Sequence, residues 1–298
     1  MSRWTDKFSY WTGALITPDL SAFLLGRDDL MEKRTPHTVL AVLDKDTWKA
    51  KSFPFTSIAV CWGEQPAREL VLIGHEGDIA AGSVEELKRE AGINIDGDAG
   101  KVGYLRCARS IAGRIYIGGM DRQIYCRIQG GWEALDNGMP GEESTVVGLE
   151  AIDGFSSDEI YAVGHEGEIW RFDGHCWHPA ASPTNLILLG VHCAADGFVY
   201  ACGQVGTVLR GRGDEWEVIA NAATQEDFWD VISFKGVLYL ATRDVLYALK
   251  DGELAPVDFG ETNIPFSFYR FAASDKYLLT IGSKDVMRFD GNTWSRVD

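Results

Sequence analysis

The stretch Asp158-Glu-Ile-Tyr-Ala-Val-Gly-His-Glu-Gly-Glu-Ile-Trp-Arg-Phe-Asp-Gly-His-Cys-Trp177 decides the fold of this chain. It holds short apolar runs separated by glycine-rich turns, which is the pattern of antiparallel strands joined by hairpins. Related stretches recur along the sequence, and a repeat of roughly 40 residues made of short strands is typical of a β-propeller. The strands expected in this unit are 147–152, 159–164, 168–172 and 176–180.

Two register marks give the number of units. The first is the small residue that closes the second strand, which recurs at intervals of roughly 40 to 48 residues as Gly26, Gly74, Gly118, Gly164, Gly203, Thr242 and Gly282. The second is a turn followed by an indole near the end of most units, at Trp48, Trp132, Trp177, Trp216 and Trp294. We expect each indole to pack its outer strand against the neighbouring unit. The marks indicate seven units.

The predicted fold class is therefore all-β: a single seven-bladed β-propeller of four-stranded antiparallel blades over residues 1–298. The expected blades span approximately 8–52, 55–90, 103–136, 147–180, 187–220, 228–258 and 267–298. One short helix is predicted near 83–91, because Ser83 and Glu86 form a capping-box pattern ahead of helix-forming residues and Gly92.

The quoted stretch resembles repeats of the form D-x-h-Y-A-V-G-x-x-G-x-I-h-x-h-D-G-x-x-W, in which h is apolar. Such repeats are found in seven-bladed propellers of the BNR and WD40-like superfamily. The match is close at 158–177 and fair at 196–216 and 275–294, whereas the Gly-His and Trp-Asp dipeptides of true WD40 repeats are missing at repeat spacing. The chain also looks like bacterial propellers encoded beside secreted antibacterial toxins. That resemblance implies an immunity protein.

Composition and charge limit the kinds of molecule that the chain is expected to bind. The chain is 46% hydrophobic and carries a formal net charge of -16, so it repels nucleic-acid phosphate and attracts a basic protein. The N-terminus has no apolar signal-peptide core, and no run approaches the ~20 apolar residues of a membrane helix. The six cysteines show no CxxC spacing. We therefore expect a cytoplasmic protein that binds neither nucleic acid nor membrane, without disulfides, cofactors or a metal site.

The face that carries the B–C and D–A connections is the expected binding surface, where A to D denote the strands of a blade from the axis outward. Acidic D–A loops with nearby aromatic residues suit a basic protein partner. The candidate partner-binding residues are Glu142, Glu143, Glu226, Asp227, Trp229, Phe259, Glu261, His75, Glu76, His165 and Glu166. The last four come from two identical Gly-His-Glu-Gly turns. A metal or acid/base site is an alternative there, but turns two blades apart need not converge, and repeat consensus explains them.

A second set of candidates lies near the mouth of the central channel, at the start of the inner strands. These residues are Arg106, Glu150, His192, Asp230 and Arg270. Buried charges are costly unless they are paired or hydrated, so a ring of mutually satisfied pairs is expected. The alternative is an axial site for a small molecule, as in a propeller hydrolase or lyase.

The function predicted from these patterns is non-enzymatic protein binding, with no catalytic residues. Its most specific form is an immunity protein that neutralises a cognate, basic toxin domain. Besides the axial enzyme, a carbohydrate-binding module is a further alternative, because Trp11, Trp62 and Trp229 could be exposed for sugar stacking.

Overall fold

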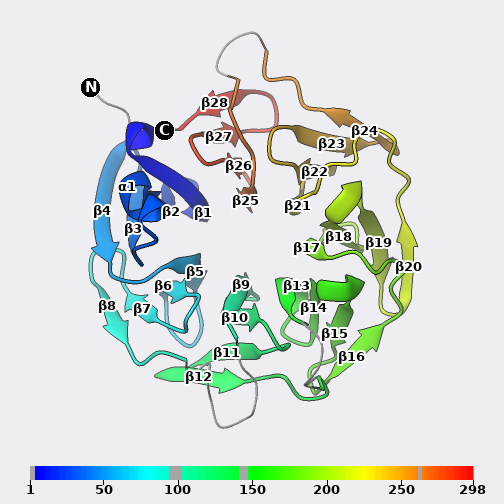
Figure 1. Cartoon of the computed structure of the whole chain (residues 1–298), viewed down its shortest axis with the longest axis horizontal. Helices are drawn as coiled ribbons and strands as arrows, with labels where there is room; N and C mark the ends of the chain where they lie inside the picture. The colour runs from blue at the N-terminus through cyan, green and yellow to red at the C-terminus, as the bar shows by residue number, and fades with distance from the viewer. Residues whose placement is uncertain (1–3, 94–102, 141–146, 261–263, 298) are drawn as a thin grey trace.

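The structure is a computed structural model that describes residues 4–93, 103–140, 147–260 and 264–297. These residues form seven four-stranded antiparallel sheets arranged around one axis, which confirms the predicted propeller (Figure 1). In every sheet the strands follow chain order from the axis outward, so that the innermost strands are β1, β5, β9, β13, β17, β21 and β25. No helix in this part of the chain is long and apolar enough to span a membrane.

The first four blades are built from these strands. Blade one has β1 (Phe8–Thr17), β2 (Leu20–Arg27), β3 (Thr38–Asp44) and β4 (Thr47–Phe53). Blade two has β5 (Ser57–Gly63), β6 (Glu69–Gly74), β7 (Ile79–Gly82) and β8 (Leu87–Glu90). Blade three has β9 (Leu105–Ile111), β10 (Arg114–Gly119), β11 (Ile124–Ile128) and β12 (Gly131–Ala134). Blade four has β13 (Leu149–Ser156), β14 (Glu159–Gly164), β15 (Ile169–Phe172) and β16 (Trp177–Ala180).

The remaining three blades repeat the arrangement. Blade five has β17 (Leu188–Cys193), β18 (Val199–Gly203), β19 (Val208–Arg212) and β20 (Glu215–Val218). Blade six has β21 (Asp230–Phe234), β22 (Val237–Ala241), β23 (Leu246–Lys250) and β24 (Glu253–Pro256). Blade seven has β25 (Arg270–Ala273), β26 (Leu278–Ile281), β27 (Val286–Phe289) and β28 (Trp294–Arg296). Short 3-10 turns lie at η1 (Trp4–Asp6), η2 (His165–Gly167) and η3 (Gln204–Gly206).

The helix predicted near 83–91 is wrong. The α-helix of the described residues is α1 (Asp28–Glu32), in the insertion between β2 and β3, while residues 87–90 form β8. The Ser83 hydroxyl does accept the Glu86 N–H, as in a helix cap. However, β8 then pairs with β7 and buries Leu87 against blade one, so the demand for an outer strand overrides local helix propensity.

The core lies between neighbouring blades, and the indoles at the blade ends contribute to it as predicted. Trp177 is buried against blade three, where its Nε1–H donates to the Leu135 carbonyl at 2.7 Å. The other four blade-end indoles each pack against the preceding blade; they are Trp48, Trp132, Trp216 and Trp294. The core is therefore a ring of inter-blade layers.

The ring closes between blades seven and one by packing, because neither of their sheets borrows a strand from the other. Tyr10 and Phe23 of blade one share an apolar cluster with Ile281 of blade seven. The Tyr10 N–H donates to the Ser283 carbonyl at 2.8 Å, and Lys284 Nζ binds Asp28 Oδ2 at 2.7 Å. Hydrophobic burial and a few polar contacts thus replace a shared strand.

Candidate functional site

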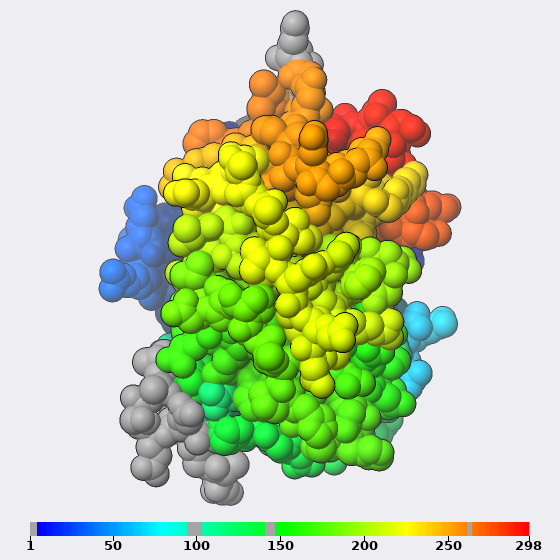
Figure 2. Space-filling model, turned by 90° about the vertical axis from the view of Figure 1, so that its right-hand side faces the viewer, coloured from blue at the N-terminus to red at the C-terminus, as the bar shows by residue number. Residues whose placement is uncertain are grey.

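The propeller has two unlike faces. We call the face with the B–C and D–A connections the loop face; it carries, among others, residues 27–37, 75–78, 165–168, 204–207, 219–229, 257–260 and 264–269. We call the other the turn face, because its short A–B and C–D turns merely reverse the chain. Figure 2 views the ring from the side, and the blue segment around α1 projects from the loop face on the left. The inner strands begin at the loop face, so their first residues surround the channel mouth.

Charged side chains pair at the channel mouth. Inner strands of all seven blades line an axial cavity of about 440 Å³. Arg106 of β9 binds Glu150 of β13 with two donors, Nε at 3.0 Å from Oε1 and Nη2 at 2.9 Å from Oε2. His165 Nε2 lies 3.1 Å from the same Glu150 Oε1. Both carboxylate oxygens of this buried glutamate are therefore occupied.

Asp230 and Arg270 link blades six and seven through backbone groups. Asp230 accepts the N–H groups of Val231 and Phe271, each at 2.9 Å, and Arg270 Nη1 donates to the Trp229 carbonyl at 2.6 Å. Burial raises the pKa of Asp230, and the Arg270 charge opposes that shift. These contacts join blade to blade, and each carboxylate oxygen of Asp230 accepts one backbone N–H.

A deeper tier of polar residues was missed by the sequence analysis, except for His192. Asp153 Oδ1 lies 3.4 Å from Arg109 Nε, and its Oδ2 lies 3.1 Å from His192 Nδ1 and 3.0 Å from the Cys193 N–H. His192 Nε2 is in turn 2.9 Å from the Ser233 hydroxyl. The chain of contacts crosses blades three to six. Burial alone would raise the pKa of Asp153, but Arg109 and His192 hold it below its usual value.

A β-bulge explains why Arg109 and Asp153 were missed. The register shifts at Glu150 on β13 and at the start of β9 beside Arg106. A bulge inserts one extra residue, so that residues three apart in sequence can both face the axis. In blade five the shift falls at Leu189, which lines the cavity. A signal was available in the sequence, because two charged residues lie three positions apart in each of these inner strands. They are Arg106 and Arg109 in β9, and Glu150 and Asp153 in β13.

The two Gly-His-Glu-Gly turns do not converge. The His75 ring packs on Tyr104 with 4.9 Å between ring centroids, and His165 contacts Glu150 in the channel mouth. Glu76 and Glu166 are exposed on their separate turns. Within the described ranges, the metal-binding atoms that do come together belong to a different hairpin on the turn face, with Asp173, Cys176 and His178.

The acidic and aromatic candidates have diverse surroundings. Glu226 is exposed, while Asp227 Oδ1 accepts the Val205 N–H at 2.9 Å and so fixes the blade-five turn. Trp229 is half-buried beside Tyr269, and Phe259 packs between Phe268 and Trp294. Glu142, Glu143 and Glu261 lie outside the described residues. Of the aromatic candidates, Phe259 contributes mainly to blade packing.

Exposed apolar side chains on the loop face are the residues that sequence reasoning missed. Among the described residues, the large apolar side chains exposed on this face are Met31, Tyr104, Val205, Ile264 and Phe266. The comparable ones elsewhere are Ile128, Phe198 and Val218. Phe266 and Ile264 adjoin a polar run, and Val205 occupies a turn whose counterpart in blade four is Glu166, so no periodicity marks them.

Two of these apolar residues are held in place by buried or hydrogen-bonded carboxylates. The Phe266 N–H donates to Asp285 Oδ2 at 2.6 Å, and the buried Asp285 is paired with Arg296 at 2.5 Å. Val205 is held by Asp227 and has φ of 54°, in the left-handed region that β-branched residues rarely adopt. Strain of this kind persists where the structure enforces it and concentrates at functional sites.

No family model matches the chain. The immune protein Tsi7 of Pseudomonas aeruginosa is 38% identical over 306 residues, covering 100% of both chains. Among solved structures, YCF48 bound to a D1 peptide superposes with a TM-score of 0.70 at 14% identity, covering 96% of this chain and 93% of that one. The WD40 propeller domain of Doa1 has a TM-score of 0.70 at 12% identity, covering 97% and 93%.

Proposed function

Because the chain belongs to the family of the immune protein Tsi7, we propose that it is an immunity protein that binds a bacterial toxin and neutralises it by covering its surface. The observation that carries this function is the 38% identity to Tsi7 along both full lengths. Neutralisation by binding needs a complementary surface and no chemistry of the chain's own. We place the protein in the cytoplasm, where a toxin entering the cell would meet it.

The loop face is the proposed docking surface. It presents exposed apolar side chains among polar ones, and protein interfaces combine an apolar centre with polar surroundings in this way. Phe266 and Val205 are pre-positioned by hydrogen bonds to Asp285 and Asp227. Binding to side chains that are already fixed costs less conformational entropy than binding that must first order a loop of this chain. Within the described ranges, the turn face presents Phe198, whose N–H donates to Asp196 Oδ1 at 3.0 Å, but Phe198 is less exposed than Val205 or Phe266.

A basic toxin domain is the favoured partner, since the chain carries a formal net charge of -16. Opposite charge raises the rate of encounter, and salt screens that effect. The same charge disfavours nucleic acid and anionic membrane surfaces as partners.

The contacts of the channel mouth favour binding over catalysis. An axial hydrolase or lyase needs a carboxylate or histidine free to move a proton or hold a cation. Glu150, Asp230 and Asp153 instead accept contacts from arginine, histidine or backbone N–H groups of neighbouring blades. Sugar stacking finds little support either, because Trp11, Trp62 and Trp229 are all half-buried.

Co-expression tests the function directly. The protein encoded next to this chain is produced in bacterial cells with and without it, and growth is followed. The neighbour alone is expected to stop growth, and the chain is expected to restore it. The proposal fails if growth stays arrested although both proteins are produced and folded.

Charge steering is tested at Glu226, which is exposed on the loop face. Glu226→Lys is expected to slow association with the toxin severalfold at low salt, and the difference should shrink as salt rises, because screening removes long-range attraction. Stopped-flow or surface-binding kinetics measure the rate. Glu215→Lys makes the same charge change at the start of β20, close to the turn face, and should have a much smaller effect. Equal slowing by the two variants would contradict steering by the loop face.

A substitution at Val205 is expected to raise the stability of the protein and to weaken its binding to the toxin. Val205→Asn is expected to increase the free energy of unfolding by about 1 kcal/mol, because asparagine tolerates positive φ far better than a β-branched residue. The same substitution is expected to weaken toxin binding, since it removes an exposed apolar contact. Denaturant unfolding and calorimetric titration measure the two effects. A variant that is stabilised but binds as well as wild type would remove Val205 from the interface.

A further inference from the structure

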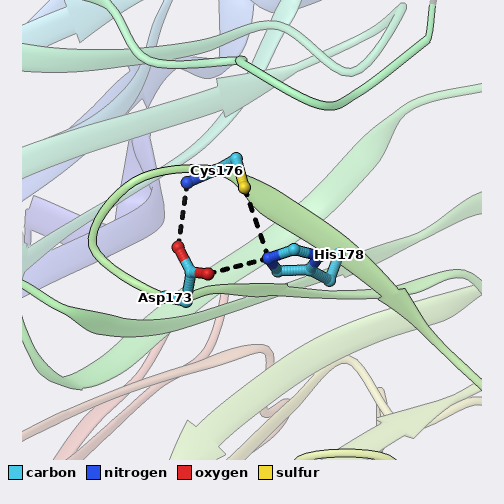
Figure 3. A group of neighbouring side chains, drawn as sticks. All are labelled: Asp173, Cys176 and His178. Carbon is cyan, nitrogen blue, oxygen red and sulfur yellow. Dashed lines mark hydrogen bonds and ion pairs between the residues drawn. The ribbon is translucent and has the colours of Figure 1, made fainter.

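The hairpin that joins β15 to β16 carries three metal-binding groups on the turn face (Figure 3). Asp173, Cys176 and His178 each offer one ligand atom, and these atoms all lie within 4.8 Å of one another. His178 Nε2 is 2.8 Å from Asp173 Oδ2 and 3.3 Å from Cys176 Sγ. The spacing Asp-x-x-Cys-x-His differs from the CxxC pattern that the sequence analysis sought.

Strand geometry brings the groups together. Trp177 points into the core between blades three and four, so its neighbours Cys176 and His178 both point outward on the same side of the strand. Asp173 lies at the other side of the tight turn. Its Oδ1 accepts the N–H groups of His175 and Cys176, each at 2.9 Å, and this leaves Oδ2 directed at the imidazole.

A second hairpin of the same protein shows which part of this arrangement belongs to the repeat. In blade seven Asp290, Thr293 and Ser295 occupy the positions of Asp173, Cys176 and His178. Asp290 Oδ1 likewise accepts two turn N–H groups, from Asn292 at 2.7 Å and Thr293 at 2.8 Å. The aspartate therefore serves the turn in both blades. The thiol and the imidazole that face it are peculiar to blade four.

From this geometry we infer that Asp173, Cys176 and His178 bind a divalent transition-metal ion of the zinc class, with a fourth position open to solvent. Thiolate, imidazole and carboxylate are the ligands of Zn²⁺, at bond lengths of about 2.0 to 2.3 Å. Tetrahedral angles then separate the ligand atoms by roughly 3.3 to 3.8 Å. The two separations from His178 Nε2, 2.8 Å to Asp173 Oδ2 and 3.3 Å to Cys176 Sγ, reach this range with shifts below about 1 Å in exposed or half-buried side chains. When the metal binds, Cys176 releases its thiol proton to solvent. His178 Nε2 then coordinates the metal and gives up its present contacts with Asp173 Oδ2 and Cys176 Sγ.

This site goes beyond the proposed function and is independent of it, because it lies on the turn face. The test uses untagged, chemically reduced, metal-free protein titrated with Co²⁺ and then Zn²⁺. Wild type should bind one equivalent of Co²⁺ with a thiolate-to-cobalt charge-transfer band, and Zn²⁺ should abolish the band. Asp173→Asn keeps the turn acceptor and should weaken binding at least about tenfold.

Reciprocal variants give the matched control. Cys176→Thr with His178→Ser copies the blade-seven hairpin and should lose the band and the bound equivalent. Thr293→Cys with Ser295→His copies the blade-four hairpin and should bind two equivalents in place of one. The inference is overturned if wild type binds no Co²⁺ in this titration. It is also overturned if the first double variant binds as wild type does, since the metal would then sit on another thiol such as Cys193.

Discussion

Phe266→Arg is expected to abolish neutralisation while the protein stays folded. Phe266 is 76% exposed, the most exposed large apolar side chain among the described residues, and its backbone N–H is fixed by Asp285. Aromatic anchors at interfaces contribute about 2 kcal/mol or more, which is at least about thirtyfold in Kd. The arginine adds repulsion toward a basic partner. Calorimetric titration with the toxin and growth rescue measure the loss.

Phe198→Arg is the matched control for this result. Phe198 is 41% exposed and lies on the A–B turn of blade five, on the turn face. The substitution therefore makes the same side-chain change on the opposite face. It should bind and rescue as wild type does. A second matched pair is Val205→Arg and Val218→Arg, because these valines are 54% and 55% exposed. If Phe198→Arg or Val218→Arg abolishes binding and the loop-face variants do not, the toxin does not dock on the loop face.

Asp153→Ala is expected to destabilise the ring by about 2 kcal/mol, because it removes a buried carboxylate that accepts contacts from several neighbouring groups. Arg109, His192 and the Cys193 N–H would all lose their common acceptor. The effect should be seen as a lower denaturant midpoint. Glu253→Ala truncates an exposed carboxylate on β24 and should change the unfolding free energy by less than about 0.5 kcal/mol. Equal effects of the two variants would show that the Asp153 contacts contribute nothing to stability.

The pH dependence of this destabilisation has a definite sign. The folded state lowers the pKa of Asp153 below its usual 3.8, since Arg109 and His192 outweigh the effect of burial. The stability that ionised Asp153 contributes is therefore fully present above pH 3.8, and it is lost as the pH falls through the lower pKa of the folded state. The difference in unfolding free energy between wild type and Asp153→Asn should be constant near neutral pH and shrink below about pH 4. A difference that grows on acidification would contradict this assignment.

Most of the fold could be predicted because each unit repeats the same local signals. The expected strands of blade four, 147–152, 159–164, 168–172 and 176–180, fall on β13 to β16 with shifts of a few residues at the ends. The segment near 83–91 shows the limit of local reasoning. Ser83 caps the Glu86 N–H in a way that fits a helix, yet pairing with β7 decides the outcome. Only the neighbouring strand and blade carry that information.

The site was less predictable, for two physical reasons. Bulges change which residues of an inner strand face the axis, and Arg109 and Asp153 were missed because an unbroken strand would alternate. Exposed apolar residues in turns leave no periodic trace, so Val205 and Phe266 could be recognised only from their exposure and from the carboxylates that hold them. Acidic side chains such as Glu226 were identifiable because charge on a predicted loop is visible in sequence.

Hydrogen–deuterium exchange of the chain, alone and saturated with its toxin, tests most directly where the partner docks. Protection is expected in the B–C and D–A connections, above all in peptides that contain Val205 and Phe266. The A–B and C–D turns, including 173–176, should exchange at the same rate in both states. Protection confined to the turns or to the outer strands, with the loop face unchanged, would contradict docking on the loop face.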